Sequence, residues 1–262
     1  MKIRFLALAA VALLALACGV ISGAARADGV GVILMHGKDG TGKPQSPVGK
    51  LASYLEAQGM TVVLPDMPWS RSRGLDKTLE DSFSEIDKMI EELRAKGMTK
   101  IILGGHSMGG CAALAYATQV VGLDGILVMA PGLRPVFRAR ENAAVLAKAK
   151  ALVDAGKAGE MVDVVDRNQG DNFTRNVRAD VAISWFSPDG LANMALSSPK
   201  VKSGTPVYVI IGNKDRYHSE ASTEIFEKLP AHPKSAYKVI PGGHKVTPFK
   251  GKSEIADWIK NL

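Results

Sequence analysis

The 262-residue sequence contains only two cysteines, Cys18 and Cys111. Cys18 falls in an N-terminal segment that we predict below to be removed, so Cys111 has no cysteine to pair with and an intrachain disulfide is excluded. A chain of this length can bury enough apolar surface to fold without cross-links. We therefore expect a single domain that is stabilised by a hydrophobic core.

Three other features are missing, and each excludes a class of protein. No His, Cys, Asp and Glu residues are grouped with metal-ligand spacing, and Asp163, Asp166 and Asp171 are interpreted as solvated loop charges. No helical segment interleaves basic with aromatic residues, so the formal net charge of +7 indicates a mildly basic surface and not a nucleic-acid interface. No hydrophobic run after residue 27 is long enough for an integral membrane span. The oligomeric state is not indicated.

The first 27 residues have the pattern of a secretory signal peptide. Two basic residues precede an apolar run over residues 5–17, and Ala25 and Ala27 provide the small side chains that a signal peptidase prefers. Cleavage before Asp28 would produce a periplasmic or secreted protein. Lipidation of Cys18 is an alternative, but Ala15 stands where such sites usually carry leucine.

From residue 30 onward, short β-branched runs alternate with amphipathic segments. Continuous apolar runs are typical of strands that are covered on both faces, and a 3.6-residue apolar period is typical of the helices that cover them. Six runs are predicted to be strands: 31–35, 61–65, 100–103, 125–129, 207–211 and 237–240. The sequence therefore predicts an α/β fold with a mostly parallel sheet of about six strands and helices on both faces.

Residues 132–202 interrupt this alternation. A crossover between parallel strands needs roughly a dozen residues, so this segment is an insertion. Residues 143–155 are rich in alanine and are predicted to be helical, whereas the polar residues 168–176 are predicted to form a loop. We expect a helical lid over a core made of residues 28–131 and 203–262, with a solvated spacer as the alternative.

The sequence GHSMG at residues 105–109 follows a predicted strand and precedes an alanine-rich helix. This spacing is typical of a nucleophile elbow, in which a tight strand-to-helix turn holds the central serine, here Ser107, at the edge of the sheet. The amide of Met108 would then lie at a helix N-terminus, where it can stabilise a developing negative charge.

A serine hydroxyl needs a base that takes its proton and a third group that orients the base. Asp215 follows the strand that ends near residue 211, and His244 follows the strand that ends at residue 240. Because the carboxyl ends of parallel strands share one edge of a sheet, we expect both side chains to lie near Ser107. We predict that Ser107 is the nucleophile, His244 the base and Asp215 the residue that orients it.

The turn after the first strand is predicted to complete an oxyanion hole. The amide of Lys38 is the preferred second donor, and the amide of Gly37 is the alternative. Residues 37–43 also resemble a phosphate-binding loop, but Pro44 stands where that motif requires a serine or threonine.

With these motifs in order, the chain resembles the α/β-hydrolase superfamily from residue 30 to the C-terminus, and its layout is similar to small carboxylesterases and monoacylglycerol-lipase-like enzymes. The resemblance implies a triad of Ser107, Asp215 and His244, an oxyanion hole at Met108 and Lys38, and no cofactor. The first two strands of the family have no counterpart here, which implies a sheet of six strands.

These observations predict a serine hydrolase that cleaves carboxylic esters through an acyl-enzyme. The loop over residues 67–73 should reach the rim of the site, so Trp69, Arg71 and Arg73 are candidate substrate contacts, the two arginines for a carboxylate or phosphate. Two solvated arginines are the alternative. An amidase or peptidase with the same triad and a non-catalytic binding protein on the same fold also stay open.

Overall fold

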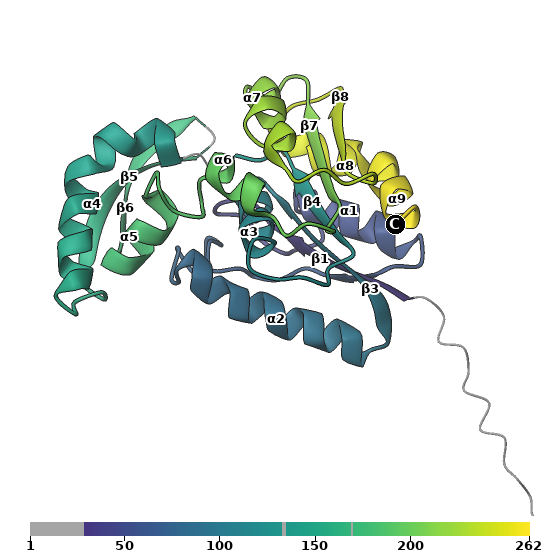
Figure 1. The fold of residues 1–262 in the computed structure, drawn as a ribbon, viewed down its shortest axis with the longest axis horizontal. Coiled ribbons are helices and arrows are strands. Elements are labelled where there is room, and N and C mark those ends of the chain that lie inside the picture. Colours follow the sequence, from purple (N-terminus) through teal and green to yellow (C-terminus); the bar gives the residue numbers. More distant parts are fainter. Residues whose placement is uncertain (1–28, 133–134, 169) are drawn as a thin grey trace, which may run out of the picture.

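The computed structural model describes residues 29–132, 135–168 and 170–262. A central sheet has helices on both faces, and a separate group of elements extends from one side of it (Figure 1). The predicted signal peptide, its cleavage site and Cys18 lie outside the described residues.

The strands of the central sheet are all parallel and follow the order β2-β1-β3-β4-β7-β8. They are β1 (Gly29–Met35), β2 (Thr61–Val63), β3 (Met98–His106), β4 (Gly125–Met129), β7 (Val207–Gly212) and β8 (Ala236–Ile240). The prediction of a six-stranded, mostly parallel sheet is confirmed. Because the strands are parallel, the loops that follow β1, β3, β7 and β8 all leave from the same edge of the sheet.

Helices cover this sheet on both faces. The first face carries α1 (Pro47–Glu56), α8 (Thr247–Lys250) and α9 (Lys252–Lys260), and the second carries α2 (Leu79–Ala95) and α3 (Met108–Tyr116). The shorter helical elements are η1 (Pro135–Arg138), α6 (Met194–Ser197), η2 (Ser198–Lys200), α7 (His218–Thr223), η3 (Phe226–Lys228) and η4 (His244–Val246). Their burial follows the sequence pattern, since Leu51 and Ile255 pack with Val32 on the first face and Ile86 packs with Ile33 on the second.

The insertion, residues 132–202, leaves the sheet after β4 and returns before β7. Its main elements are α4 (Ala139–Asp154), β5 (Met161–Asn168), β6 (Asp171–Arg178) and α5 (Ala179–Phe186). The prediction of a loop over residues 168–176 is wrong, because β5 and β6 pair as an antiparallel hairpin. Charged residues in both strands conceal their alternation, in which Val162, Val164 and Asp166 point inward.

The interior of the insertion is continuous with the core on the α2 and α3 face. Val164, Val181 and Trp185 belong to the same buried cluster as Ile33. Trp185 also packs edge-on against Trp69, with ring centroids 5.4 Å apart, and its indole N–H donates to the carbonyl of Lys77 at 3.0 Å. The insertion is therefore packed against the sheet domain through buried side chains from both parts.

Candidate active site

Ser107 joins β3 to α3 with φ 55° and ψ −115°, a left-handed conformation that serine seldom adopts. Its amide donates to the carbonyl of Met129 at 2.9 Å, which fixes the turn to β4. Two glycines make the conformation sterically possible. A Cβ on Gly105 would lie 2.1 Å from the carbonyl carbon of Gly109, and a Cβ on Gly109 would lie 2.7 Å from the carbonyl oxygen of His36. Larger residues at either position would force these segments apart.

Asp215 and His244 meet at the same edge of the sheet. Nδ1 of His244 lies 2.7 Å from Oδ2 of Asp215, and the amide of Tyr217 donates to Oδ1 at 3.1 Å. Burial acts to raise the pKa of Asp215, but the hydrogen bond and charge of His244 outweigh it and lower that pKa below its ordinary value. Because an ionised carboxylate can only accept, Nδ1 donates to it, and in the neutral form of the ring Nε2 carries the lone pair.

His106 packs against the ring of His244 and forms a hydrogen bond with its backbone. Its Nε2 donates to the carbonyl oxygen of His244 at 3.0 Å, and the two rings lie 4.9 Å apart. Burial lowers the pKa of His106 to about 3, so its ring is neutral at ordinary pH. His106 therefore contributes a fixed hydrogen bond, and no exchangeable charge, beside the predicted base.

Gly132, the first residue of the insertion, touches both predicted reacting groups. A Cβ built on it would lie 2.6 Å from Oγ of Ser107, 3.0 Å from Cε1 of His244 and 3.4 Å from Nε2 of the same ring. The hydroxyl and the ring nitrogen thus flank one small volume next to the Gly132 backbone. No sequence motif marked this glycine, because it stands at the start of the insertion, after β4, and belongs to no recognised pattern.

Met108 and Lys38 line the cavity that contains Ser107. Within the described residues, neither amide donates to a protein acceptor, so both are available to an incoming oxyanion. Gly37 lies just as close, since a Cβ on it would stand 3.2 Å from Cβ of Ser107. The structure therefore brings all three predicted donor residues next to the elbow.

Two cavities open on Ser107. The larger, of about 710 Å³, lies between the sheet domain and the insertion, and both His244 and Asp215 contribute to its lining. The smaller, of about 310 Å³, is lined by the loops after β1 and β2, including Arg71. Arg71 thus lies at the rim as predicted, and its role in substrate binding stays a prediction.

Cys111 lines neither of the two cavities. Cys111 is buried on α3, where burial raises the pKa of its thiol to about 12, and its Sγ contacts the carbonyl of Ala192 at 3.3 Å. Among the residues that the structure describes, no three His, Cys, Asp or Glu side chains gather as a metal site. None of the described helices combines the length and hydropathy needed to cross a membrane.

The sequence profile described as the alpha/beta hydrolase family matches residues 32–257. The chain belongs to that family. A search of the curated proteins found no match to this hydrolase.

Solved structures of similar fold include several lipolytic enzymes. A monoacylglycerol lipase from Paleococcus ferrophilus has a TM-score of 0.63 at 22% identity, covering 88% of the hydrolase and 94% of that chain. A thermostable carboxyl esterase from Bacillus coagulans has a TM-score of 0.66 at 17% identity, covering 90% and 91%. A proline iminopeptidase from Mycobacterium smegmatis has a TM-score of 0.53 at 18% identity, covering 88% and 89%. At these identities the likeness shows the fold alone.

Trp69 does not contact the cavity, which corrects its predicted role in substrate binding. The residue is 1% exposed and its indole N–H donates to the carbonyl of His36 at 2.7 Å. Its own carbonyl accepts the amide of Asp39 at 2.9 Å. Trp69 therefore braces the loop that carries Lys38. The sequence placed the residue near the site but could not show which way its ring points.

His36 holds the same loop from the other side. Its Nε2 accepts the amide of Met67 at 3.1 Å, and its Nδ1 lies 2.8 Å from the carbonyl of Gly37. Burial lowers the pKa of His36, which keeps the ring neutral and Nε2 able to accept. His36 therefore has a structural role in the loop that carries Lys38.

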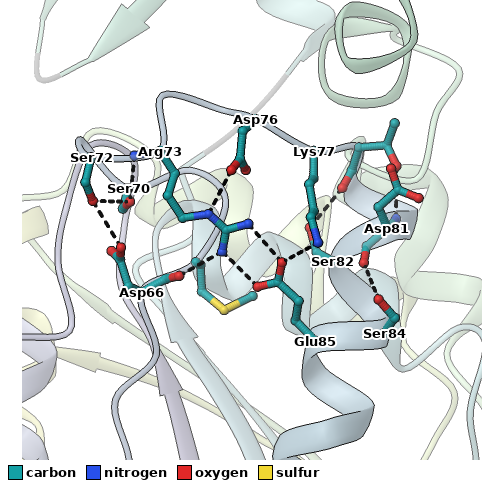
Figure 2. A network of polar contacts seen from close by, with 12 residues as sticks. Asp66, Ser70, Ser72, Arg73, Asp76, Lys77, Asp81, Ser82, Ser84 and Glu85 are labelled. Atoms are coloured by element: carbon teal, nitrogen blue, oxygen red, sulfur yellow. Dashed lines mark hydrogen bonds and ion pairs between the residues drawn. The ribbon is translucent and has the colours of Figure 1, made fainter. Parts of the chain in front are cut away.

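The predicted role of Arg73 in substrate binding is also corrected, because its guanidinium is part of a network of polar contacts on the β2–α2 loop (Figure 2). The group forms two hydrogen bonds of 2.9 Å to Glu85 and one of 3.0 Å to Asp76. The hydrogen bond from Arg73 is the main cause that lowers the pKa of Glu85 to about 2. This pairing stabilises the fold above the ordinary pKa of a glutamate and is lost as pH falls toward 2. Arg73 holds the loop to α2 and lines neither cavity.

The β5–β6 hairpin is tied to the predicted oxyanion loop by ion pairs, in which Asp166 is buried and its partners are partly buried. Asp166 accepts hydrogen bonds from Nζ of Lys38 and, at 2.9 Å, from Nε of Arg175. Arg175 also donates to Asp39 at 2.9 and 3.0 Å, and Asn168 donates to the same carboxylate at 2.8 Å. Asp166 is 3% exposed, so its interpretation as a solvated loop charge is wrong. The alternation of inward-facing residues along β5 is the sequence pattern that could have predicted the burial of Asp166.

Replacement of Gly132 by alanine tests the crowding at the predicted reacting groups. We expect Gly132→Ala to slow hydrolysis of a 4-nitrophenyl ester by about 10²-fold, because the new methyl group would displace the Ser107 hydroxyl or the His244 ring. Gly159→Ala is the matched control, since a Cβ there meets no atom within 4 Å. Turnover and thermal unfolding are measured for both variants. Equal turnover in the two would contradict the placement.

Protonation of His106 gives the stability a pH dependence. In the unfolded chain this imidazole takes up a proton near its ordinary pKa of 6.5, but the folded protein does so only near 3. Between these values the unfolded state binds more protons, so stability falls as pH decreases. Urea unfolding at about pH 7.5, 6 and 5 should show a shallower decline for His106→Gln than for the wild type. Parallel curves would refute this.

Proposed function

We propose that this hydrolase cleaves small carboxylic esters through an acyl-enzyme on Ser107. The observation that carries the proposal is the 2.7 Å hydrogen bond between His244 and Asp215 at a cavity that also contains a strained, elbow-held serine. Fold alone would not support it, because non-catalytic proteins can share an architecture. The lipolytic enzymes among the similar structures favour an ester over other acyl substrates.

In the first half of the reaction, Nε2 of His244 takes the proton from Ser107 while Oγ bonds to the ester carbonyl carbon. Negative charge develops on the carbonyl oxygen, where the amides of Met108 and Lys38 stabilise it. The tetrahedral intermediate collapses, the bond to the alkoxy oxygen breaks, and His244 returns the proton to the departing alcohol. Asp215 stays ionised and stabilises the imidazolium between these two transfers.

In the second half, water replaces the alcohol. His244 takes a proton from that water as its oxygen attacks the acyl carbon, and the same two amides hold the second oxyanion. The bond to Oγ then breaks, Ser107 recovers its proton from His244, and the carboxylic acid is released. Every proton and electron pair is accounted for by the three side chains and water, so the mechanism requires no cofactor.

The insertion and the N-terminus complete the proposal. Residues of η1, β5 and α5 line the larger cavity opposite Ser107, so the insertion serves as a lid that limits the size of the substrate. The basic, apolar and small-residue pattern of residues 1–27 supports export to the periplasm or the exterior.

Ser107→Ala is the decisive test. We expect the variant to fold normally and to lose at least about 10³-fold in turnover of 4-nitrophenyl butyrate, because no other group can form the acyl-enzyme. Labelling by a fluorophosphonate probe should disappear with it. Ser219→Ala, at an exposed serine on α7, is the matched control and should retain both signals. Unchanged turnover in Ser107→Ala, or a wild type that never labels, would overturn the proposal.

A paired substrate assay separates esters from peptides. The proline iminopeptidase of similar fold makes a 4-nitroanilide of proline the relevant comparison for 4-nitrophenyl acetate and butyrate. Faster cleavage of the esters supports the proposal, and faster cleavage of the anilide assigns the same triad to a peptidase.

A further inference from the structure

We propose that the ester substrate carries an anionic group, a carboxylate or a phosphate monoester, which Arg216, Arg167 and Lys214 bind in the larger cavity. The proposal rests on the ester hydrolysis proposed above and names its substrate class. The observation behind it is a group of three cations in the lining of the cavity at Ser107 that form no ion pair with a carboxylate of the described residues.

The three cations reach the cavity from both of its walls. Lys214 and Arg216 flank Asp215 on the turn after β7, and Arg167 belongs to β5 of the insertion. All three residues are exposed, and no carboxylate of the described residues lies within ion-pair distance of their side chains. The guanidinium of Arg216 stacks on the ring of Tyr217, 4.6 Å from its centroid, which orients it beside the cavity.

Other basic residues of the same lining are neutralised, which makes the contrast informative. Lys38 pairs with Asp166, and Arg138 pairs with Glu141. The carboxylate of Asp215 is likewise paired with His244. Glu220 also lines the cavity, where it accepts the hydroxyl of Ser219 at 2.8 Å, and no ion pair joins it to any of the three cations.

The smaller cavity adds to the positive field on the other side of Ser107. Arg71 and Lys245 line it, both are exposed, and neither forms an ion pair with a described carboxylate. We assign the anion to the larger cavity because its three cations come from two facing walls and enclose one volume. The cations of the smaller cavity raise the local concentration of an anionic substrate but do not bind its anionic group.

A charge remote from the reacting carbonyl interacts equally with the bound substrate and the transition state. Such an interaction lowers KM and leaves kcat unchanged. It also weakens as salt screens it, over a Debye length of about 10 Å at 0.1 M. A recognition role for these cations therefore predicts a KM effect that is selective for charged esters and sensitive to salt, which a merely solvated surface would not produce.

The test uses three 4-nitrophenyl esters that differ at the far end of the acyl chain: the glutarate half-ester, its methyl-capped diester, and the ester of 4-(phosphonooxy)butanoic acid. At low salt we expect the wild type to prefer at least one anionic ester over the capped one by about tenfold or more in kcat/KM, the scale of one charge-assisted hydrogen bond. The better of the two anionic esters identifies the group. The preference should shrink at about 0.5 M NaCl.

Arg216→Gln and the triple variant that also carries Arg167→Gln and Lys214→Gln should lose this preference through a higher KM, with kcat and the capped ester unaffected. Arg140→Gln is the matched control, because Arg140 is an exposed arginine of α4 outside both cavities. Equal kcat/KM for charged and capped esters in the wild type, or a preference that survives in the triple variant, would overturn the anion proposal while ester hydrolysis stands. Absence of turnover and of fluorophosphonate labelling would instead overturn the proposed function.

Discussion

At Gly105 and Gly109, β3, α3 and the loop after β1 pass so close together that no side chain fits between them. This contact forces Ser107 into its left-handed conformation and presents its hydroxyl at the edge of the sheet. The strain costs on the order of 1–3 kcal/mol, which the surrounding core must offset. Met108, Lys38, the imidazole of His244 and both cavities all lie around this turn.

A second constraint couples the insertion to the site. Asp166 is buried between Lys38 and Arg175, and Arg175 continues to Asp39. Removal of one member from such a buried pair typically costs about 3–5 kcal/mol, because the remaining charge is left without a partner. The side chain of Lys38 is therefore held by the hairpin. Displacement of the hairpin would also move the loop that carries Lys38, the predicted oxyanion donor.

Much of the fold and of the candidate site could be predicted from the sequence. The apolar runs of β1, β3, β4 and β7 are typical of buried parallel strands, and the spacing of GHSMG at residues 105–109 specifies a turn almost by itself. Asp215 and His244 were predictable because parallel strands bring their carboxyl ends together. These inferences depend on local pattern and on chain direction, and both are encoded within a few residues.

What escaped prediction depends on side-chain direction and on distant partners. Trp69 and Arg73 lie on a loop that passes the site, but neither side chain reaches a cavity. The ring of Trp69 points into the core, and the guanidinium of Arg73 pairs with Glu85, twelve positions along the chain. The β5–β6 hairpin was hidden because its inward face carries Asp166. The charge of Asp166 is paired with Lys38, more than a hundred residues earlier, and with Arg175 on the neighbouring strand. Long-range pairing of this kind leaves no trace in local periodicity.

In the proposed ester hydrolysis, the two cavities would receive different parts of the substrate, and they are built from different parts of the chain. Loops of the sheet domain form nearly all of the smaller one, and the larger is shared with η1, β5 and α5 of the insertion. Substitutions in residues 135–186 can therefore reshape the fit for one half of a substrate while the other half meets an unaltered surface. Acyl and alcohol preferences can thus diverge independently among related sequences without disturbing the turn at Ser107.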